Sequence, residues 1–545
     1  MEDMFAALVY GPDFAAMDEN MRELTCDTLP KPTVATAAPL SNAVAARPPS
    51  DGVDRISHLP VEILRNIASR LPAKDAARTT ALAKRWRRVW PLAPLVLVDA
   101  HLLSASRLGP PSRTFGWGSL DAIWRAIEDG AQHQIAVCNA LSAHPGPFAC
   151  IYLVGTNMKE FKGMAAAWLD LLAAKRVKEL VFVHPATNIE DDVHLPASIF
   201  RCTALTKLYI GTWWFPDAAD LPRIAGFPYL QELGLCNLVM KEQDLAVVLD
   251  RCPVLEKLLI TRSRWPVCLR IQSRSLRCVQ VTLGLVPEIT VDNASRLERL
   301  LLWEAWGGGG LTNMSSKIKF GHAPKLRFLG FLVPGMHQLE IGNTAIKVNT
   351  KASPYTTVPS VRMLGVQVKL GTRIEAGMLP SFLRCFPNVE TLYVQSENDD
   401  NKFWGPHSSG IGKINLKFWK EAGPIECIQR HIKKLVLREL QGKRSELDFL
   451  KFIAEHAQVL EEMVIMMTHG FLPSDNVGAK LRIFMASAKW ANGCCKMMVL
   501  KSSFGGEGTA WCYPRGFDFS VEDPFDVSKC FEGKCVSLVK VELSR

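Results

Sequence analysis

An apolar pattern of six residues recurs through the middle of the chain, with the form apolar-x-x-apolar-x-apolar. Its last two apolar positions alternate with other residues, which predicts one short strand with a buried face in each copy. A single copy cannot bury that face alone, so neighbouring copies must stack and form a parallel sheet. The eleven copies begin at Val177, Leu205, Leu230, Leu255, Leu276, Leu297, Leu326, Val361, Val389, Ile432 and Leu460.

Several of the intervals between these copies fit the period of roughly 20 to 29 residues that is typical of leucine-rich repeats. One such hexamer would also fit a buried strand of an ordinary α/β domain, whereas eleven copies in register favour a repeat array. We therefore expect a curved solenoid over about residues 150–500. Its strand anchors Leu208, Leu233, Leu258 and Leu300 should lie on neighbouring parallel strands.

A helical pattern precedes the repeats between residues 54 and 90. Pro60 suits the first turn of a helix, and apolar residues follow it at helical spacing at Ile63, Leu64, Ile67 and Leu71. The pair Leu71–Pro72 should end this helix, because the residue before a proline is disfavoured in the α region. Asp75 is expected to cap a second helix that runs to about Ala83. A short third helix would carry Trp86, Val89 and Trp90 on its apolar side.

Shorter patterns predict further elements on both sides of the repeats. Residues 92–99 and 151–154 are strand-like, and residues 120–127 indicate a helix. Residues 423–467 combine a strand, a helix at 446–456 and a second strand, which makes one further turn of the array. Residues 501–545 end in a strand-like run and are expected to cap the last repeat, whose apolar end would otherwise be exposed.

Composition places the chain among intracellular globular proteins. Of its 545 residues 48% are hydrophobic, and no run of about 18 apolar residues predicts a transmembrane helix. Residues 1–20 lack the features of a secretory signal, so we expect the protein in the cytoplasm, the nucleus or both. Most of the 15 cysteines should then be buried free thiols. The stretch 29–50 is rich in Ala, Pro, Thr and Ser, which predicts a disordered leader over residues 1–53.

Charge and candidate chemistry exclude several classes of function. The formal net charge is +10, but the basic residues are spread thinly and no nucleic-acid-binding motif is present, so nucleic acid is an unlikely partner. Cys494–Cys495 and Cys530 to Cys535 lack the paired spacing of a structural zinc site. The glycines 307–310 lack the Lys-Ser/Thr and helix of a phosphate-binding loop. We expect no metal, no cofactor, no membrane contact and no catalytic site.

The helical region closely resembles a plant-type F-box. In that family the first helix and its Leu-Pro entrance dock on the Skp-type adaptor of a cullin-RING ubiquitin ligase. By this resemblance the adaptor-binding residues are Leu59, Pro60, Ile63, Leu64, Ile67 and Leu71. Ala83 departs from the family, which often has a capping serine there. The matching residues are Leu59-Pro60-x-Glu62-Ile63-Leu64, Ile67, Leu71-Pro72-x-Lys74-Asp75, Arg78-Thr79 and Lys84-Arg85-Trp86-Arg87-x-Val89-Trp90.

The region 423–467 resembles the FBD domain that plant F-box/leucine-rich-repeat proteins carry near the C-terminus, with matches such as Glu446-Leu447-x-Phe449-Leu450. The expected fold is thus α/β, a small three-helix F-box followed by an irregular leucine-rich-repeat solenoid with an FBD-type C-terminal repeat. The expected boundaries are leader 1–53, F-box 54–98, lead-in and repeats 99–420, FBD-like domain 421–500 and capping tail 501–545.

The resemblance implies a non-catalytic adaptor of a Skp–cullin–F-box ubiquitin ligase, with the repeats recruiting a protein substrate. The alternative is a repeat scaffold that binds a partner without any link to ubiquitination. Aromatic residues near the strands are candidate interface anchors, although such residues also serve as packing. The candidate substrate-binding residues are Tyr209, Trp213, Trp214, Trp303, Trp306 and Tyr393.

Overall fold

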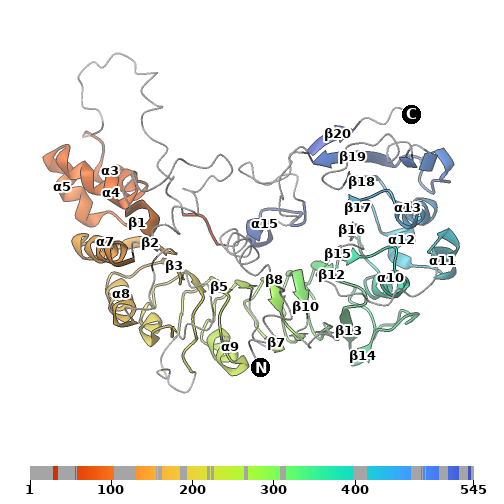
Figure 1. Ribbon diagram of the computed structural model, residues 1–545, viewed down its shortest axis with the longest axis horizontal. Coiled ribbons are helices and arrows are strands. Elements are labelled where there is room, and N and C mark those ends of the chain that lie inside the picture. The colour runs from red at the N-terminus through yellow and green to blue at the C-terminus, as the bar shows by residue number, and fades with distance from the viewer. Residues whose placement is uncertain are drawn as a thin grey trace, which may run out of the picture. The chain divides into compact units, whose positions relative to one another are not determined.

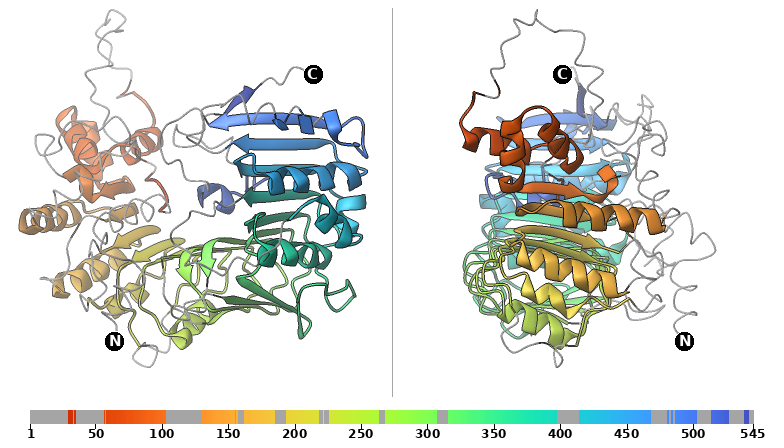
Figure 2. Two further views of the ribbon diagram at one scale, coloured as in Figure 1. Left: turned by 45° about the vertical axis from the view of Figure 1, so that its right-hand side comes forward. Right: turned by 90° about the vertical axis from the view of Figure 1, so that its left-hand side faces the viewer.

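The protein is described by a computed structural model that divides into two compact units, Met1–Pro266 and Val267–Arg545 (Figures 1 and 2). Each unit is built around a parallel sheet. No helix in the described part of the chain has the length and hydrophobicity needed to cross a bilayer. The described residues are 29–32, 34, 56, 58–102, 130–154, 156, 162–184, 193–217, 221, 226–262, 268–306, 315–396, 414–467, 480–502 without 482 and 485, 513–526 and 538–541.

Among its described residues, the first unit contains six parallel strands that follow one another in chain order. Leu208, Leu233 and Leu258 are register partners on three adjacent strands and are buried, as the repeat pattern predicts. The strands are β1 (Leu95–Val98), β2 (Phe148–Leu153), β3 (Glu179–Val183), β4 (Lys207–Gly211), β5 (Glu232–Cys236) and β6 (Lys257–Thr261).

Parallel strands need a crossover connection, and the first unit supplies several of these with helices. α7 (Gly130–Ala143) precedes β2, α8 (Lys162–Ala174) precedes β3 and α9 (Glu242–Asp250) precedes β6. A 3-10 helix, η5 (Ala197–Arg201), takes this place before β4. The chain therefore repeats a unit of strand and return segment, as in a leucine-rich repeat.

In the described residues of the second unit, the main sheet holds nine strands, of which all but the last are parallel. Figure 2 shows these strands stacked one above another. Leu300 is the register partner of Val279 and of Leu329, and the same buried row continues through Leu364 and Leu392. The strands are β8 (Cys278–Leu285), β10 (Arg299–Trp306), β12 (Phe328–Leu332), β15 (Met363–Val368), β16 (Thr391–Ser396), β17 (Lys434–Leu440), β18 (Glu462–Met467), β19 (Lys496–Ser502) and β20 (Leu538–Val541).

All eleven apolar hexamers lie where the pattern places them. In every copy a strand of the main sheets begins two residues after the first apolar anchor, for example β4 after Leu205 and β16 after Val389. All eleven first anchors are buried, with at most 1% of their surface exposed. The burial of these anchors confirms the repeats as the source of the sheet and the α/β fold class.

A second, smaller sheet in the second unit does not follow from the hexamer pattern. Its strands are β7 (Cys268–Ile271), β9 (Glu288–Val291), β11 (Ser316–Phe320), β13 (His337–Ile341) and β14 (Thr344–Ala345). Buried residues alternate with exposed or partly exposed ones along β7, β9, β11 and β13, as where the partly exposed Thr290 separates the buried Ile289 and Val291. In these repeats the return segment is therefore a second strand, where in others it is a helix. The alternation of apolar residues was the signal in the sequence that could have predicted these strands.

The predicted helices near the start of the repeats are present, with corrected boundaries. They are α3 (Val61–Ser69), α4 (Ala73–Arg78) and α5 (Lys84–Val89). The cap assigned to Asp75 is wrong, because Pro72 precedes the first helical residue and Asp75 lies inside the first turn, where it accepts a hydrogen bond from Arg78 at 2.9 Å. The second helix also stops before Ala83, at Arg78, and a 3-10 turn follows. Ala83 is the N-cap of α5 and supplies no side-chain cap.

The C-terminal repeat matches its predicted order of strand, helix and strand. The helix α13 (Arg444–His456) connects β17 and β18, and α10 (Arg373–Cys385), α11 (Leu416–Glu421) and α12 (Glu426–Arg430) precede it. β20 pairs antiparallel with β19 and is the last strand of the sheet, and the capping role of residues 501–545 stays a prediction.

Parts of the sequence-based expectations lie outside the described residues. These are the predicted helix at 120–127, the glycines 307–310 and most of the leader. Within the leader, Leu29 and Val34 are buried, and the prediction of a disordered leader stays a prediction. A composition averaged over the leader cannot detect two packed apolar side chains.

Native alkylation should distinguish the cysteines of this fold. Burial raises the pKa of the Cys150, Cys202 and Cys385 thiols to about 12, whereas Cys494 is exposed. Because the thiolate is the nucleophile, iodoacetamide at pH 8 should label Cys494 long before these three. Peptide mapping by mass spectrometry measures the order, and urea should make all four equally reactive. Early labelling of the three buried thiols in the native protein would contradict the fold.

Candidate protein-interaction surfaces

The first candidate surface lies on and before α3 and is apolar. Pro60 is exposed and Leu59 is half-buried at the start of the helix. Ile63 is 47% exposed, while Ile67 and Leu71 are half-buried. Pro60, Ile63 and Ile67 share one helical face by their spacing. A set of neighbouring apolar side chains left in water by the fold is typical of a protein-binding surface.

The core beneath this surface is already filled. Leu64, Ala68, Trp86 and Val89 have at most 4% of their surface exposed. Leu64 was predicted to bind the adaptor together with Ile63, but its side chain has no exposed surface. In this arrangement Leu64 supports the surface from inside and Ile63 forms part of it.

The three-helix module is attached to the sheet of the first unit. Pro72 forms a parallel bridge with Val96 of β1, and the Arg65 guanidinium donates to the Leu92 carbonyl at 3.2 Å. Trp90 packs edge-on against His144 with ring centroids 4.8 Å apart. Burial holds the pKa of His144 below its usual range, which favours the neutral ring. The module and the first repeats therefore form one body, so its apolar surface is held in a defined orientation to the repeats.

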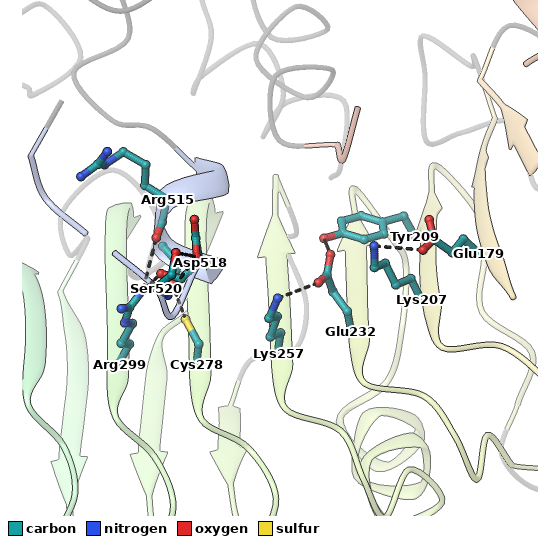
Figure 3. Close-up of polar contacts among 11 residues, drawn as sticks. Glu179, Lys207, Tyr209, Glu232, Lys257, Cys278, Arg299, Arg515, Asp518 and Ser520 are labelled. Carbon is teal, nitrogen blue, oxygen red and sulfur yellow. Dashed lines mark hydrogen bonds and ion pairs between the residues drawn. The ribbon is translucent and has the colours of Figure 1, made fainter. Parts of the chain in front are cut away.

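The second candidate surface is the sheet face of the first unit, and a ladder of charges crosses it (Figure 3). Glu179, Lys207, Glu232 and Lys257 are register partners on four adjacent strands. Lys207 lies 3.0 Å from Glu179, and Lys257 lies 3.1 Å from Glu232. Opposite charges alternate along the row, so these groups satisfy one another on the face.

Tyr209 belongs to the same ladder and has only 2% of its surface exposed. Its hydroxyl donates to Glu232 at 2.6 Å (Figure 3). Burial, with the charge of Glu232, raises the pKa of Tyr209 well above its usual range. The ring lies over Gly234, where an added Cβ would come within 2.2 Å of Tyr209 Cδ1. The absent side chain at Gly234 is what lets the ring lie flat on the next strand.

The other candidate substrate-binding aromatics occupy different environments. Trp213 is 1% exposed and donates from its indole to the Phe182 carbonyl at 3.0 Å, which is a core position. Trp214 is half-buried. Trp303 is buried with its ring edge-on to Phe331. The side chain of Trp306 lies outside the described residues. Substrate binding by these residues stays a prediction.

The third candidate surface is the sheet face of the second unit, where Tyr393 lies. Tyr393 is 2% exposed, and its hydroxyl donates to Asp523 at 2.7 Å. Residues 513–526, which include α15 (Tyr513–Phe517), cover this face. Arg438 and Phe525 also meet here, and neither was among the predicted site residues. An arginine at a strand position that alternates with apolar core residues was the available signal for Arg438.

The described residues hold no group of three or more His, Cys, Asp or Glu side chains suited to a metal ion. The three candidate surfaces are an apolar patch on a helical module and two sheet faces built from repeats.

Comparison with known protein families gives three matches in chain order. Residues 56–95 match the F-box domain and residues 420–465 match FBD. Residues 165–394 match a family described as "FBD-associated F-box protein At5g56370, LRR repeats". The F-box match contains the apolar surface on α3, and the LRR-repeat match contains most of the segment from β3 to β16.

Individual relatives come from Arabidopsis thaliana. F-box/LRR-repeat protein 13 is 24% identical over 78% of this chain and 93% of its own length. FBD-associated F-box protein At4g10400 is 22% identical over 74% of this chain and 90% of its own length. F-box/LRR-repeat protein At3g26922 is 28% identical over 38% of this chain, and the chain spans 60% of its length.

Proposed function

We propose that this chain, which matches the F-box, LRR-repeat and FBD family models in that order, is a plant F-box/leucine-rich-repeat/FBD protein that recruits a protein substrate to a Skp–cullin–F-box ubiquitin ligase. F-box proteins are generally substrate adaptors of such ligases and typically do no chemistry themselves. In this proposal the module around α3 docks on the Skp-type adaptor, which bridges to the cullin. The repeats bind the substrate, and the complex acts in the cytoplasm, the nucleus or both.

The observation that supports this proposal is the apolar surface on α3 over a complete core. Ile63 is 47% exposed although the neighbouring Leu64 has no exposed surface. Transfer of an exposed Ile side chain from water to an interface is favourable by roughly 1.5–3 kcal/mol when the burial is complete. A bound adaptor would bury the 47% of the Ile63 surface that the module leaves in water.

Replacing Ile63 by alanine tests the proposal directly. We expect the affinity of the full chain for a purified Skp-type adaptor to fall roughly tenfold to a hundredfold, because the lost contact is apolar burial at an interface. Isothermal titration calorimetry measures the change, and the melting temperature should stay within the range of a surface substitution.

Ile135→Ala is the matched control for this experiment. Ile135 is 58% exposed on α7 of the same unit, so the same side-chain change occurs at a comparable exposure away from α3. Its adaptor affinity should equal that of the unmodified chain. Equal affinities of the Ile63→Ala and Ile135→Ala variants would contradict the proposed docking surface.

A further inference from the structure

The C-terminal segment 513–526 lies across the sheet face of the second unit and does not add a strand to it. With rising residue number it meets successive strands of that sheet. Gly516 accepts a hydrogen bond from Cys278 of β8, Asp523 accepts one from Tyr393 of β16, and Phe525 accepts one from Arg438 of β17. The face is formed by side chains that alternate along each strand with the buried core row.

Arg299 of β10 holds the first half of the segment by its backbone (Figure 3). Its guanidinium donates to the carbonyl oxygens of Gly516 and Asp518, both at 2.9 Å, and of Val521 at 2.7 Å. Arg438 donates in the same way to the carbonyl of Phe525. Carbonyl groups occur in every peptide, so these two buried arginines recognise the path of a backbone.

Three side chains of the segment supply the specific contacts. The guanidinium carbon of Arg277 lies over the Phe519 ring, 3.7 Å from the ring centroid. Phe525 has no exposed surface, and its ring centroid lies 5.2 Å from that of Phe331. Asp523 accepts the hydrogen bond of the Tyr393 hydroxyl. The face therefore reads the sequence Phe-x-x-x-Asp-x-Phe.

The segment is also shaped by its own contacts. Arg515 donates to the Asp523 carbonyl at 3.0 Å, and Ser520 donates from its hydroxyl to the Asp518 carboxylate at 2.6 Å. Such preorganisation lowers the entropy cost of binding. The segment is joined to β19 on one side and to β20 on the other, so its attachment to the sheet does not depend on its contacts with the face.

We propose that this face is a peptide-binding site for a partner segment with the pattern Phe-x-x-x-Asp-x-Phe, and that residues 513–526 occupy it in cis until such a partner displaces them. The inference rests on the proposed function, since it assigns the substrate-binding site to the second unit. If this face served only to pack permanently against residues 513–526, apolar residues in place of its buried arginines would give an equally stable contact. Arginines that bind carbonyl groups fit a site that accepts more than one chain.

Exchange between the two occupants can be tested on the unmodified full chain. The probe is a synthetic peptide of residues 513–526, isotopically distinguishable from the protein. Excess peptide should increase the deuterium uptake of the chain's own residues 513–526 by mass action, and leave the core strands β15 and β16 protected. Unchanged uptake of the chain's segment at saturating peptide would overturn the proposal.

Variants test the same site by direct binding. In the full chain, Phe525→Ala should release the segment. A fluorescently labelled form of the 513–526 peptide should then bind this variant roughly ten to a hundred times more tightly than it binds the unmodified chain. Adding Arg299→Met should abolish that gain. If Phe525→Ala melts cooperatively at a much lower temperature, Phe519→Ala with Asp523→Asn replaces it. A folded released variant that binds no peptide, or a peptide that binds all chains equally, would overturn the proposal.

Two controls separate this inference from the proposed function. A peptide with alanine at the positions of Phe519 and Phe525 should not bind any variant. The affinity for a Skp-type adaptor should be the same in all these chains, because the substitutions lie in the second unit and Ile63 in the first. Failure of peptide binding with normal adaptor binding would reject only the inference, and the reverse result would reject only the adaptor role.

Discussion

Replacing Leu59 and Pro60 together by alanine is expected to weaken binding of a Skp-type adaptor roughly a thousandfold, at about 1.4 kcal/mol per tenfold change. Pro60 is the exposed N-cap of α3, and Leu59 precedes it half-buried. Truncation of two interface anchors at about 2 kcal/mol each accounts for this loss. The melting temperature of the repeats should not change, because distant sites act additively. Calorimetric titration and differential scanning calorimetry on the full chain measure the two quantities.

Leu64→Ala provides the contrast to this double variant. Leu64 has no exposed surface, so its truncation should lower the free energy of unfolding of the module by about 2–5 kcal/mol. Adaptor binding would then fall together with hydrogen-exchange protection of α3. In the Leu59→Ala, Pro60→Ala variant, α3 should keep its protection. Unchanged adaptor affinity in the double variant would contradict the adaptor role as proposed.

Removal of Glu232 is expected to lower the free energy of unfolding of the first unit by about 3 kcal/mol, since it leaves the buried Tyr209 hydroxyl and the half-buried Lys257 ammonium without their acceptor. Its two carboxylate oxygens accept hydrogen bonds from Tyr209 at 2.6 Å and from Lys257 at 3.1 Å. The side chain of Glu232 is 10% exposed, so water cannot fully replace these bonds in the Glu232→Ala variant. Urea denaturation followed by hydrogen exchange in β4 to β6 measures the loss.

Glu179→Ala is the matched control, because Glu179 occupies the same register row two strands away. Its ion pair with Lys207 has side chains 32% and 40% exposed, and its removal should cost less than about 1 kcal/mol. Adding Tyr209→Phe and Lys257→Met to the Glu232→Ala variant should restore part of the stability, because no polar partner is then left unpaired. Equal costs for the two glutamates would show that the ladder is not buried as described.

Local periodicity carried most of the fold prediction. The anchor Leu205 and the strand that follows it lie where the hexamer places them, and the same holds in all eleven copies. Each repeat needs the same short apolar face, so six residues are enough to show the pattern. It can therefore be recognised even where the intervals between repeats are irregular. The helices of the first module followed from the same kind of signal. Their caps were less well predicted, because Pro72 and not Asp75 sets the start of the second helix.

Which individual side chains are exposed could be learned only from the tertiary structure. Ile63 and Leu64 are adjacent, equally apolar and both part of the F-box-like pattern, yet one is exposed and the other buried. Periodicity assigns both to the apolar side of a helix and does not say which the core of the module takes. Likewise Tyr209 stands at a position that alternates with core residues and is nevertheless buried, because Gly234 on the next strand admits its ring.

The sequence by itself determined the elements whose signal is local: the helical module, the repeated strands and the strand–helix–strand unit at the C-terminal end. Only the tertiary structure decided what covers each sheet face. Arg299 and the Gly516 carbonyl are 217 positions apart in the chain and 2.9 Å apart in space. No periodic pattern relates such positions, because their pairing depends on how the stacked repeats bring a distant segment back over the sheet.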